Sequence, residues 1–414
     1  MARNLRTKKS VIVICFVAVL LVSLFGVREL LSVTQPVGEE YKTLAEELLT
    51  NARQEFEKIR GISVREVSLE VVNRSWVADT WGTVSNSERE EITREENIYK
   101  ALFLITQDVS LLESRMEWMT SFRAAKWQGK IYVVQENFDV TETTRTTGSF
   151  VHELTHIMQE DYSLFAATTF DAAKALTSLK EGDATLMADT YKNDGVVPVS
   201  SSESSVDDPD FSMAIGSVLE DELELSLPGT IDDLNRFPYR YGLEFVKFLY
   251  KQGGWAAIDD AYANPPYTSE QIMHPEKYYS QEGTKFVAVP QVTGDWNLVE
   301  TNRFGEYFVF VMLENWISEG DASEAAKGWG GDVFSYYELD GEFFFTWNIM
   351  WDTVDDAHEF DLAFQDMMYK TSAEKHNCSY WESNGRYISI HWNGDQTLIV
   401  SSSDEALIQK NFSE

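Results

Sequence analysis

The spacing of apolar side chains predicts two successive helices in the middle of the chain. The first covers residues 150–158, where apolar residues recur every three or four positions: Phe150, Val151, Leu154, Ile157 and Met158. The second covers residues 172–189, and its apolar positions could pack it against the first: Leu176, Leu179, Leu186 and Met187. If the two helices pack together, side chains on their facing sides could come into contact.

The residues just before the first helix also follow a recognisable pattern. Asp139 and Glu142 have the spacing of an N-cap and its reciprocal acid, which places the start of this helix near residue 139. Residues 130–134 are a short β-rich run just upstream. We expect this strand to lie at a sheet edge, because an edge strand can pair with an extended peptide.

The same reasoning divides the rest of the chain. Helical spacing covers residues 38–60, 86–122, 237–254, 305–316 and 355–368. Strand-like alternation covers residues 62–77, aromatic strands cover 336–351, and a hairpin over 387–400 turns at Asn393-Gly394. The fold class predicted is α+β, with a helix-rich domain, a short sheet and a C-terminal α+β part.

The first central helix contains the sequence His152-Glu153-Leu154-Thr155-His156, an HExxH pattern. Residues four apart share a helix face, so the two imidazoles can bind one metal ion. Glu153, one position further round, would stand beside the open coordination position. Two imidazoles, one carboxylate and a water form a catalytic zinc site. The metal acidifies its water, and the glutamate takes the proton.

The third ligand is predicted to be Glu181, on the second helix. The rivals are Asp183, two positions on, and Glu160 and Asp161, just after the histidines. Residues two apart do not share a helix face, so Glu181 and Asp183 are not expected to bind together. Asp183 better suits a role in orienting a histidine through its other ring nitrogen.

The N-terminus predicts a membrane anchor. Basic residues between Arg3 and Lys9 precede an apolar stretch at residues 11–27, which Arg28-Glu29 interrupts before Leu30-Leu31. No small-residue cleavage site follows, so residues 11–31 are the predicted membrane segment. This pattern is typical of an uncleaved signal-anchor, with residues 1–10 in the cytoplasm and the rest outside. Residues 32–60 would then be a juxtamembrane stalk or a first docking helix.

The charge of the chain limits its partners. The 68 Asp and Glu residues exceed the 34 Lys and Arg residues, so the formal net charge is −34. A chain this acidic is not a general nucleic-acid binder or a binder of anionic membranes. No motif for an organic cofactor is present.

Several segments together resemble a known type of enzyme. The residues His152–Gln159 with Glu181–Ala184 look like the gluzincin type of zinc metallopeptidase. The wider set Thr268–Tyr278, Gly328–Asp332 and Trp351–Thr353 resembles a poorly characterised group of membrane-anchored or exported archaeal and bacterial proteins. The resemblance covers about residues 60–400. It implies a Zn²⁺ ion at His152, His156 and Glu181, with Glu153 as the general base, and it supplies no substrate.

The sequence thus predicts a zinc peptidase domain at residues 61–289, with a C-terminal α+β region at 290–414 packed on it. Its partner would be a peptide or protein substrate. His274, Tyr278 and Tyr241 are candidates for stabilising the oxyanion of the tetrahedral intermediate, with His274 preferred. The alternatives are a non-catalytic surface protein with a structural zinc site, and a zinc hydrolase of non-peptide amides.

Overall fold

A computed structural model describes residues 38–82, 84–162, 166–199, 228–292, 294–377 and 379–412. The predicted anchor at residues 11–31 lies outside these residues. Within the part of the chain that is described, no helix combines the length and the apolar character needed to cross a membrane.

The first half of the chain builds a small sheet and long helices. Its elements are α1 (Glu39–Arg60), β1 (Leu69–Val72), α2 (Arg74–Trp81), α3 (Asn86–Ala101), α4 (Leu111–Thr120), β2 (Ala124–Trp127), β3 (Lys130–Val134), α5 (Thr143–Gln159) and α6 (Phe170–Lys192). The strands lie in the order β1-β3-β2, with β1 parallel and β2 antiparallel to β3.

The second half adds a larger antiparallel sheet. Its elements are α8 (Gly229–Ala263), α9 (Ser269–Met273), α10 (Pro275–Tyr279), β4 (Asn297–Asn302), α11 (Gly305–Glu314), α12 (Glu319–Ala326), β5 (Trp329–Leu339), β6 (Glu342–Trp351), α13 (Val354–Lys370), β7 (Glu374–Asn377), β8 (Tyr380–Ser383), β9 (Arg386–Asn393), β10 (Gln396–Ser402) and α14 (Glu405–Phe412). Seven strands lie in the order β4-β5-β6-β10-β9-β8-β7. The α+β class is confirmed.

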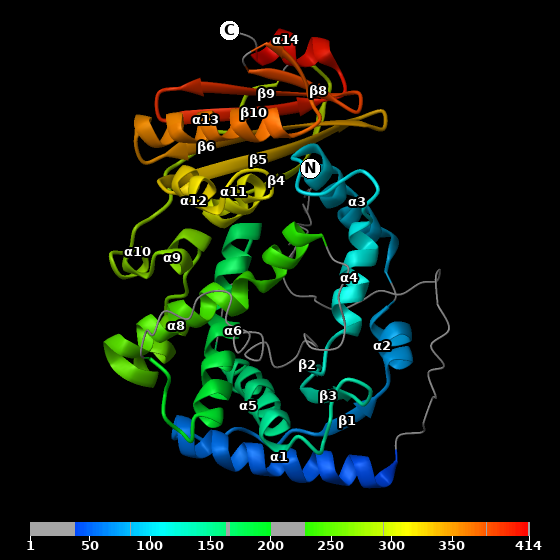
Figure 1. Ribbon diagram of the computed structural model, residues 1–414, viewed down its shortest axis with the longest axis vertical. Helices are drawn as coiled ribbons and strands as arrows, with labels where there is room; N and C mark the ends of the chain where they lie inside the picture. The colour runs from blue at the N-terminus through cyan, green and yellow to red at the C-terminus, as the bar shows by residue number, and fades with distance from the viewer. Residues whose placement is uncertain are drawn as a thin grey trace, which may run out of the picture.

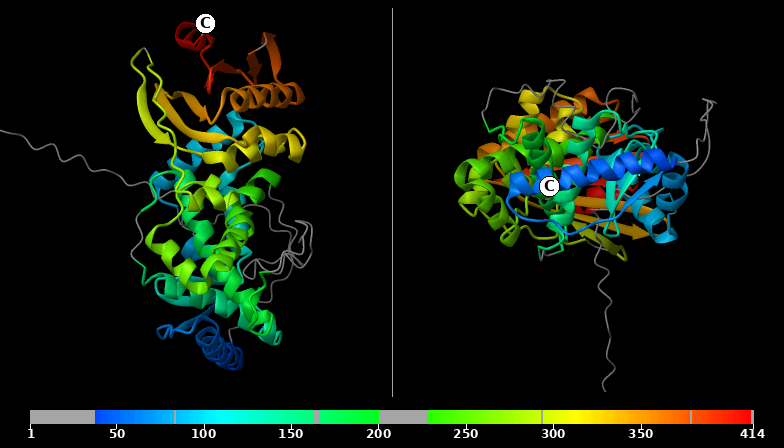
Figure 2. Two further views of the ribbon diagram at one scale, coloured as in Figure 1. Left: turned by 90° about the vertical axis from the view of Figure 1, so that its left-hand side faces the viewer. Right: turned by 90° about the horizontal axis from the view of Figure 1, so that it is seen from below.

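The molecule is elongated, with the large sheet at one end and α1 across the other (Figures 1 and 2). The largest core joins α6, α8, α11 and α13 to one face of the large sheet. A second core joins α1, β3 and α5 at the opposite end. Because α6 runs between the two cores, the central helix pair is fixed from both sides.

Helix α1 is docked rather than extended as a stalk. Ala45, Leu49, Ala52 and Phe56 lie on one face of it and are buried in the core that includes α5. Its last residue, Arg60, is also buried. Of the two predictions for this segment, a stalk or a docking helix, the second therefore describes α1.

Three local predictions were wrong. The strand expected over residues 62–77 is confined to β1, because Asn73 caps α2 by accepting a hydrogen bond from the Trp76 amide. The helix expected over residues 86–122 is broken between α3 and α4, where Leu102, Leu104 and Ile105 are all buried. Strand β3 is central in its sheet, so the edge beside α5 is β2 instead.

The start of α5 also differs from the expectation. The helix begins at Thr143, and Asp139 closes a turn by accepting hydrogen bonds from the backbone and hydroxyl of Thr141. Asp139 and Glu142 therefore do not form a capping pair. Helices α6, α11 and α13 and the β9–β10 hairpin lie where the patterns predicted them. Helix α8 contains the predicted helix at 237–254 but begins earlier, at Gly229, and continues to residue 263 through a kink at Gly253-Gly254.

Candidate metal centre

His152 and His156 stand on successive turns of α5 and point to one place. Their Nε2 atoms are 3.0 Å apart, and their rings are nearly perpendicular, with centroids 4.7 Å apart. The apolar face of the same helix is buried against α1 and β3, which turns the histidine face toward α6. The spacing of four residues has therefore brought the two imidazoles together as predicted.

Glu181 reaches the same place from α6. Its Oε2 atom is 3.3 Å from Nε2 of both histidines. That oxygen is buried and makes no hydrogen bond of good geometry. Within the described residues, His152, His156 and Glu181 form one of two clusters whose donor atoms could surround a cation.

Burial and charge favour a cation at this place. Burial alone would lower the pKa of His156, but the Glu181 carboxylate outweighs it and raises that pKa to about 9. Burial likewise opposes the charge of Glu181, and the two histidines hold its pKa well below the usual range. The carboxylate thus draws a positive charge into the space between the three side chains.

The donor set fits zinc. Ligands at ~2.0–2.1 Å from a tetrahedral zinc ion lie about 3.3 Å from one another. The three separations here are 3.0, 3.3 and 3.3 Å. Two imidazole nitrogens and one carboxylate oxygen are also the donors of a catalytic zinc site that keeps a fourth position open.

Glu153 is buried beside the donor set but is not part of it. Its charge acts on His156, on Lys126 of β2 and on Tyr239 of α8. Glu153 therefore lies close to the donor set on α5, a helix that packs against β2. A general base in a zinc peptidase needs this position, next to the metal but free of it.

Gln159 supports His156, and the sequence analysis did not identify it. Its Oε1 atom is 2.9 Å from His156 Nδ1, and its Nε2 donates to the backbone carbonyl of Lys180. Gln159 therefore orients the imidazole and ties α5 to α6 beside Glu181. The signal was available, because a residue three positions after His156 shares its helix face.

Asp183 does not orient a histidine, so that prediction was wrong. It is fully buried, and its carboxylate accepts hydrogen bonds from Arg60 at 2.9 Å and from the Tyr262 hydroxyl at 2.9 Å. Arg60 also pairs with Asp259. Asp183 thus anchors α1 and the end of α8 to the side of α6 away from the metal site.

The remaining rivals for the third ligand are engaged elsewhere or exposed. Glu160 pairs with Arg65 and with Lys126. Asp161 is exposed just beyond the end of α5. Glu181 is therefore the carboxylate that the fold brings to the histidines.

Gly182 explains how α8 reaches the site. A Cβ atom at Gly182 would lie 2.1 Å from the carbonyl oxygen of Gly242, and one at Gly242 would lie 2.2 Å from that of Ser178. The two helices therefore touch backbone to backbone. Tyr239 lies three residues before Gly242, on the same face of α8, and so projects toward α6.

Tyr239 is the tyrosine on which the charges of the candidate metal centre act, and its ring packs against the cluster of Trp118, Met119 and Phe122. Burial, followed by the charges of Glu181 and Glu153, raises the pKa of its phenol well above the usual value. Tyr241 packs instead at the core against Phe237 and Tyr307. The Tyr278 hydroxyl donates to the backbone carbonyl of Asn264. Neither of these two candidates reaches the donor set.

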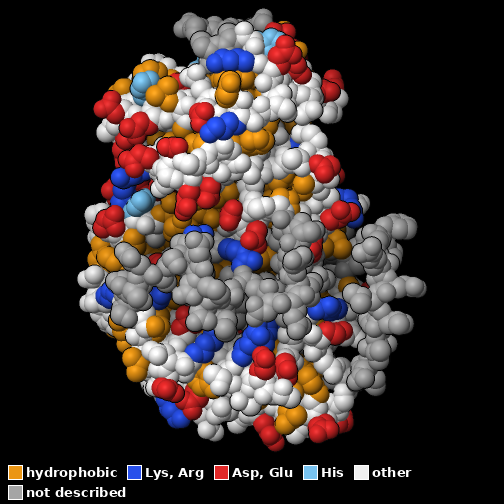
Figure 3. Space-filling model, viewed as in Figure 1, with side chains coloured by type: hydrophobic (Ala, Val, Ile, Leu, Met, Phe, Trp, Pro, Cys, Tyr) orange, Lys and Arg blue, Asp and Glu red, His pale blue; other side chains and the backbone are white. Residues whose placement is uncertain are grey.

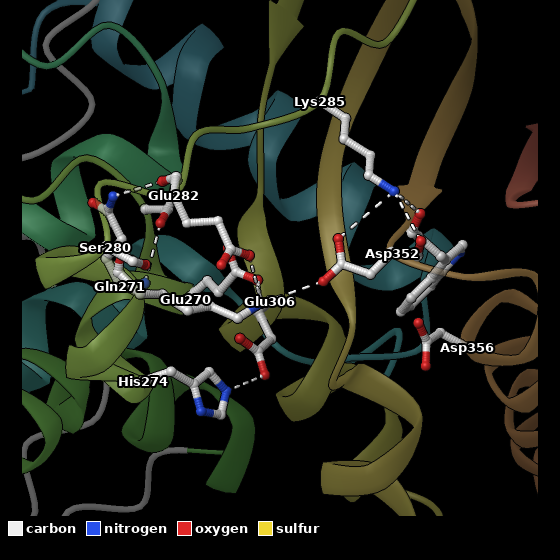
Figure 4. Close-up of polar contacts among 12 residues, drawn as sticks. Glu270, Gln271, His274, Ser280, Glu282, Lys285, Glu306, Asp352 and Asp356 are labelled. Atoms are coloured by element: carbon white, nitrogen blue, oxygen red, sulfur yellow. Dashed lines mark hydrogen bonds and ion pairs between the residues drawn. The ribbon is translucent and has the colours of Figure 1, made fainter.

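His274 also lies in a different place. It points toward Glu306, whose Oε1 atom is 2.8 Å from its Nε2, as Figure 4 shows. That hydrogen bond raises the pKa of His274. The segment that contains His274 contacts α6 near its start, where the Asp171 carboxylate accepts a hydrogen bond from the Ser269 amide. Glu181 lies ten residues later in α6, which is about 15 Å along the helix. The structure does not bring His274 to the metal centre.

The second of the two clusters consists of three acids, and the ammonium group of a lysine lies among them. Glu270, Glu282 and Asp352 surround the ammonium group of Lys277 at 2.5, 2.9 and 3.3 Å. A neighbouring lysine, Lys285, donates to the backbone carbonyl of Asp352 (Figure 4). The lysines join α9 and α10 to the large sheet, and the cluster serves as a structural junction.

The tryptophans of the Gly328–Asp332 and Trp351–Thr353 segments are core residues. Trp329 and Trp351 are fully buried. Asp332 accepts from the Phe304 and Gly305 amides and from the Trp329 and Trp347 indoles. These segments therefore hold α11 to the sheet.

Charged side chains on the visible surface are mixed. Figure 3 shows acidic side chains over the upper and lower parts of this face, with Lys and Arg interspersed. Many of the basic side chains pair with acids within a helical turn, as in the Arg236–Asp232 and Lys370–Asp366 pairs. The pattern is that of a solvated acidic surface.

Comparison with known proteins gives one match. Residues 294–410 match a family described as a domain of unknown function, DUF8575. This segment lies within the predicted C-terminal region and contains the whole large sheet. Searches of curated proteins and of solved structures give no significant match. The chemistry of the metal centre must therefore be argued from its geometry.

Proposed function

We propose that this protein is a zinc-dependent peptidase. His152, His156 and Glu181 would hold the metal, and the peptide bond of a peptide or protein substrate would be cleaved beside Glu153. The observation that carries the proposal is the convergence of three donor atoms within 3.0–3.3 Å, from buried His152 and Glu181 and half-buried His156, with a further buried glutamate, Glu153, beside His152 in the chain. We further propose that residues 11–31 anchor the domain at the outer face of a cell membrane.

When bound, zinc would supply a Lewis acid that polarises the scissile carbonyl and lowers the pKa of a water molecule. The Glu153 carboxylate would accept the proton of that water and pass it to the leaving amine. A purely structural site needs no such base, and it closes the fourth position with a protein ligand. Within the described residues, the cluster offers three ligands and leaves Glu153 aside.

Tyr239 would stabilise the oxygen of the scissile carbonyl. A phenol is protonated near neutral pH, so the Tyr239 hydroxyl can donate a hydrogen bond. A donor aimed at the developing oxyanion is worth about 10²–10³ in rate. Strand β2 presents the sheet edge beside α5, and an extended substrate could pair with it.

The test separates binding of the metal from catalysis. Glu153→Gln cannot accept a proton, so it should keep one zinc per chain while hydrolysis of a peptide library falls by about 10²–10⁴-fold. Glu181→Gln should lose zinc as well as activity, since it removes a charged ligand. Asp161→Asn, two residues beyond the motif helix and exposed, is the matched control and should retain both.

Two results would reject the proposal. One is wild-type protein, loaded with zinc, that cleaves no member of a broad peptide library. The other is a Glu153→Gln variant that is as active as wild type. Zinc binding without hydrolysis would identify the site as structural.

A further inference from the structure

A cavity of about 130 Å³ lies between α3 and the large sheet, at the end of the molecule opposite α1. Its walls come from α3 and the turn after it, from β6, β9 and β10, and from the β8–β9 turn. One wall thus belongs to the N-terminal half and the other to the DUF8575 segment. Since an engineered apolar cavity of ~150 Å³ accepts benzene, this one has room for a ligand of about six non-hydrogen atoms.

The charge of the cavity wall is opposite to that of the protein. Its side chains include Lys100 and Arg386 and several amides and hydroxyls, but no Asp or Glu. The chain as a whole carries 68 acidic residues. A wall with two cations and no acid favours an anion and disfavours an amine.

Arg386 is the cation of the wall that forms no ion pair with a carboxylate within the described residues. Its guanidinium lies over the Phe343 ring at 3.6 Å, and both terminal nitrogens donate only to the Phe343 carbonyl, at 3.4 Å. It makes no ion pair with any carboxylate of the described residues, whereas Lys100 pairs with Glu96 at 2.7 Å. Burial lowers the pKa of Arg386 to about 10. An anion in the cavity would relieve this cost of burying a charge.

Ser401 provides a second unused group in the same wall. Its Oγ atom is buried and has no hydrogen-bond partner. It stands opposite Ile388 in the β9–β10 pair, and Arg386 is two residues before Ile388, so the three share one face of the sheet. Buried hydroxyls normally find a partner, and one left open on the same sheet face as a guanidinium without a carboxylate partner indicates a ligand.

We propose that this cavity binds a small molecule with an oxyanion group, a carboxylate or a phosphate, with Arg386 as the charged anchor and Ser401 as a hydrogen-bond donor. A guanidinium presents two parallel N–H groups that match either oxyanion. The site is separate from the metal centre and does not depend on the proposed peptidase activity.

The experiment is calorimetric titration of the full-length chain with inorganic phosphate and with lactate, using glycerol as an uncharged probe of similar size. We expect one of the two anions to bind and glycerol not to bind. The stronger anion identifies the oxyanion class. His152→Ala is titrated in parallel and should bind the same anion equally well, which excludes binding at the metal centre.

Variants of the wall test the assignment. Arg386→Gln should weaken binding of the anion by about tenfold or more, because a charge-assisted hydrogen bond is lost. Arg89→Gln removes an exposed arginine from the same α3 helix and should change nothing. Ser401→Ala should weaken binding by about threefold while the protein stays folded, since the hydroxyl it removes has no partner in the chain.

Absence of binding at about 10 mM of either anion would overturn the proposal, because it would leave a cavity that holds water alone. Equal affinity in wild type and Arg386→Gln would overturn it too. If Arg386→Gln does not fold, Ser401→Ala decides: weaker binding supports the site, and unchanged binding rejects it.

Discussion

The contact between Gly182 and Gly242 can be tested by adding a single methyl group. In Gly182→Ala, the new Cβ would lie 2.1 Å from the Gly242 carbonyl oxygen and 2.4 Å from its carbonyl carbon. Both atoms belong to the backbone of α8 and cannot rotate aside. Since a carbon and an oxygen normally approach to about 3.3 Å, α8 must move away from α6 by roughly 1 Å.

Two terms set the size of the effect. Overpacking a core costs ~1–3 kcal/mol or more, and the upper part of this range applies because the clash is with backbone. Replacing glycine by alanine within a helix stabilises the helix by ~1 kcal/mol, which offsets part of this cost. The free energy of unfolding should therefore fall by about 2 kcal/mol. The displacement would also carry Tyr239 away from the metal centre, so hydrolysis should fall more than zinc affinity.

Chemical denaturation in excess zinc measures the first effect, and zinc titration with peptide hydrolysis measures the second. Gly229→Ala is the matched control, because it lies in the first turn of the same α8 helix and its Cβ would meet nothing within 4 Å. It should be neutral or slightly stabilising. If Gly182→Ala were as stable and as active as wild type, the backbone contact would not position α8 as described.

Three other substitutions test separate parts of the structure. Asp183→Asn should destabilise the fold by ~3 kcal/mol, because it leaves buried Arg60 with only the partly exposed Asp259 as a charge partner. The folded protein should still keep one zinc per chain by elemental analysis, and loss of zinc would make Asp183 a ligand. Tyr239→Phe should lower kcat about 10²-fold at unchanged zinc content, and an unaltered kcat would exclude the hydroxyl from the reaction. Asp332→Asn should cost ~2–3 kcal/mol in urea denaturation, because an amide NH₂ would face donors that now bind a carboxylate; a midpoint equal to that of wild type would contradict this role.

Features encoded by neighbouring residues were predictable from the sequence. His152 and His156 share a face because they are four apart in a helix, and the hydrophobic pattern located that helix. The β9–β10 hairpin follows from strand alternation around Asn393-Gly394. The break between α3 and α4 could have been found as well, since Ser110 caps α4 and stands three residues before Glu113.

Features that depend on distant segments were not predictable. Asp183 and its partner Arg60 are 123 residues apart, and no local pattern links them. Tyr239 comes close enough for the charge of Glu181 to act on it because the glycines at 182 and 242 let α8 touch α6. The central position of β3 was missed for the same reason, because its two neighbours, β1 and β2, are set by long-range pairing rather than by its own sequence.

The three residues Glu181, Gly182 and Asp183 face three directions, since successive helix residues are ~100° apart. Glu181 meets the histidines, Gly182 meets α8, and Asp183 meets Arg60 of α1. The contacts of Gly182 and Asp183 involve no metal ligand, so they can hold α6 in place whether or not the metal is bound. A catalytic site benefits from ligands fixed in advance, whereas a structural zinc site contributes the folding energy itself. The way α6 is held therefore favours a catalytic role for the metal centre.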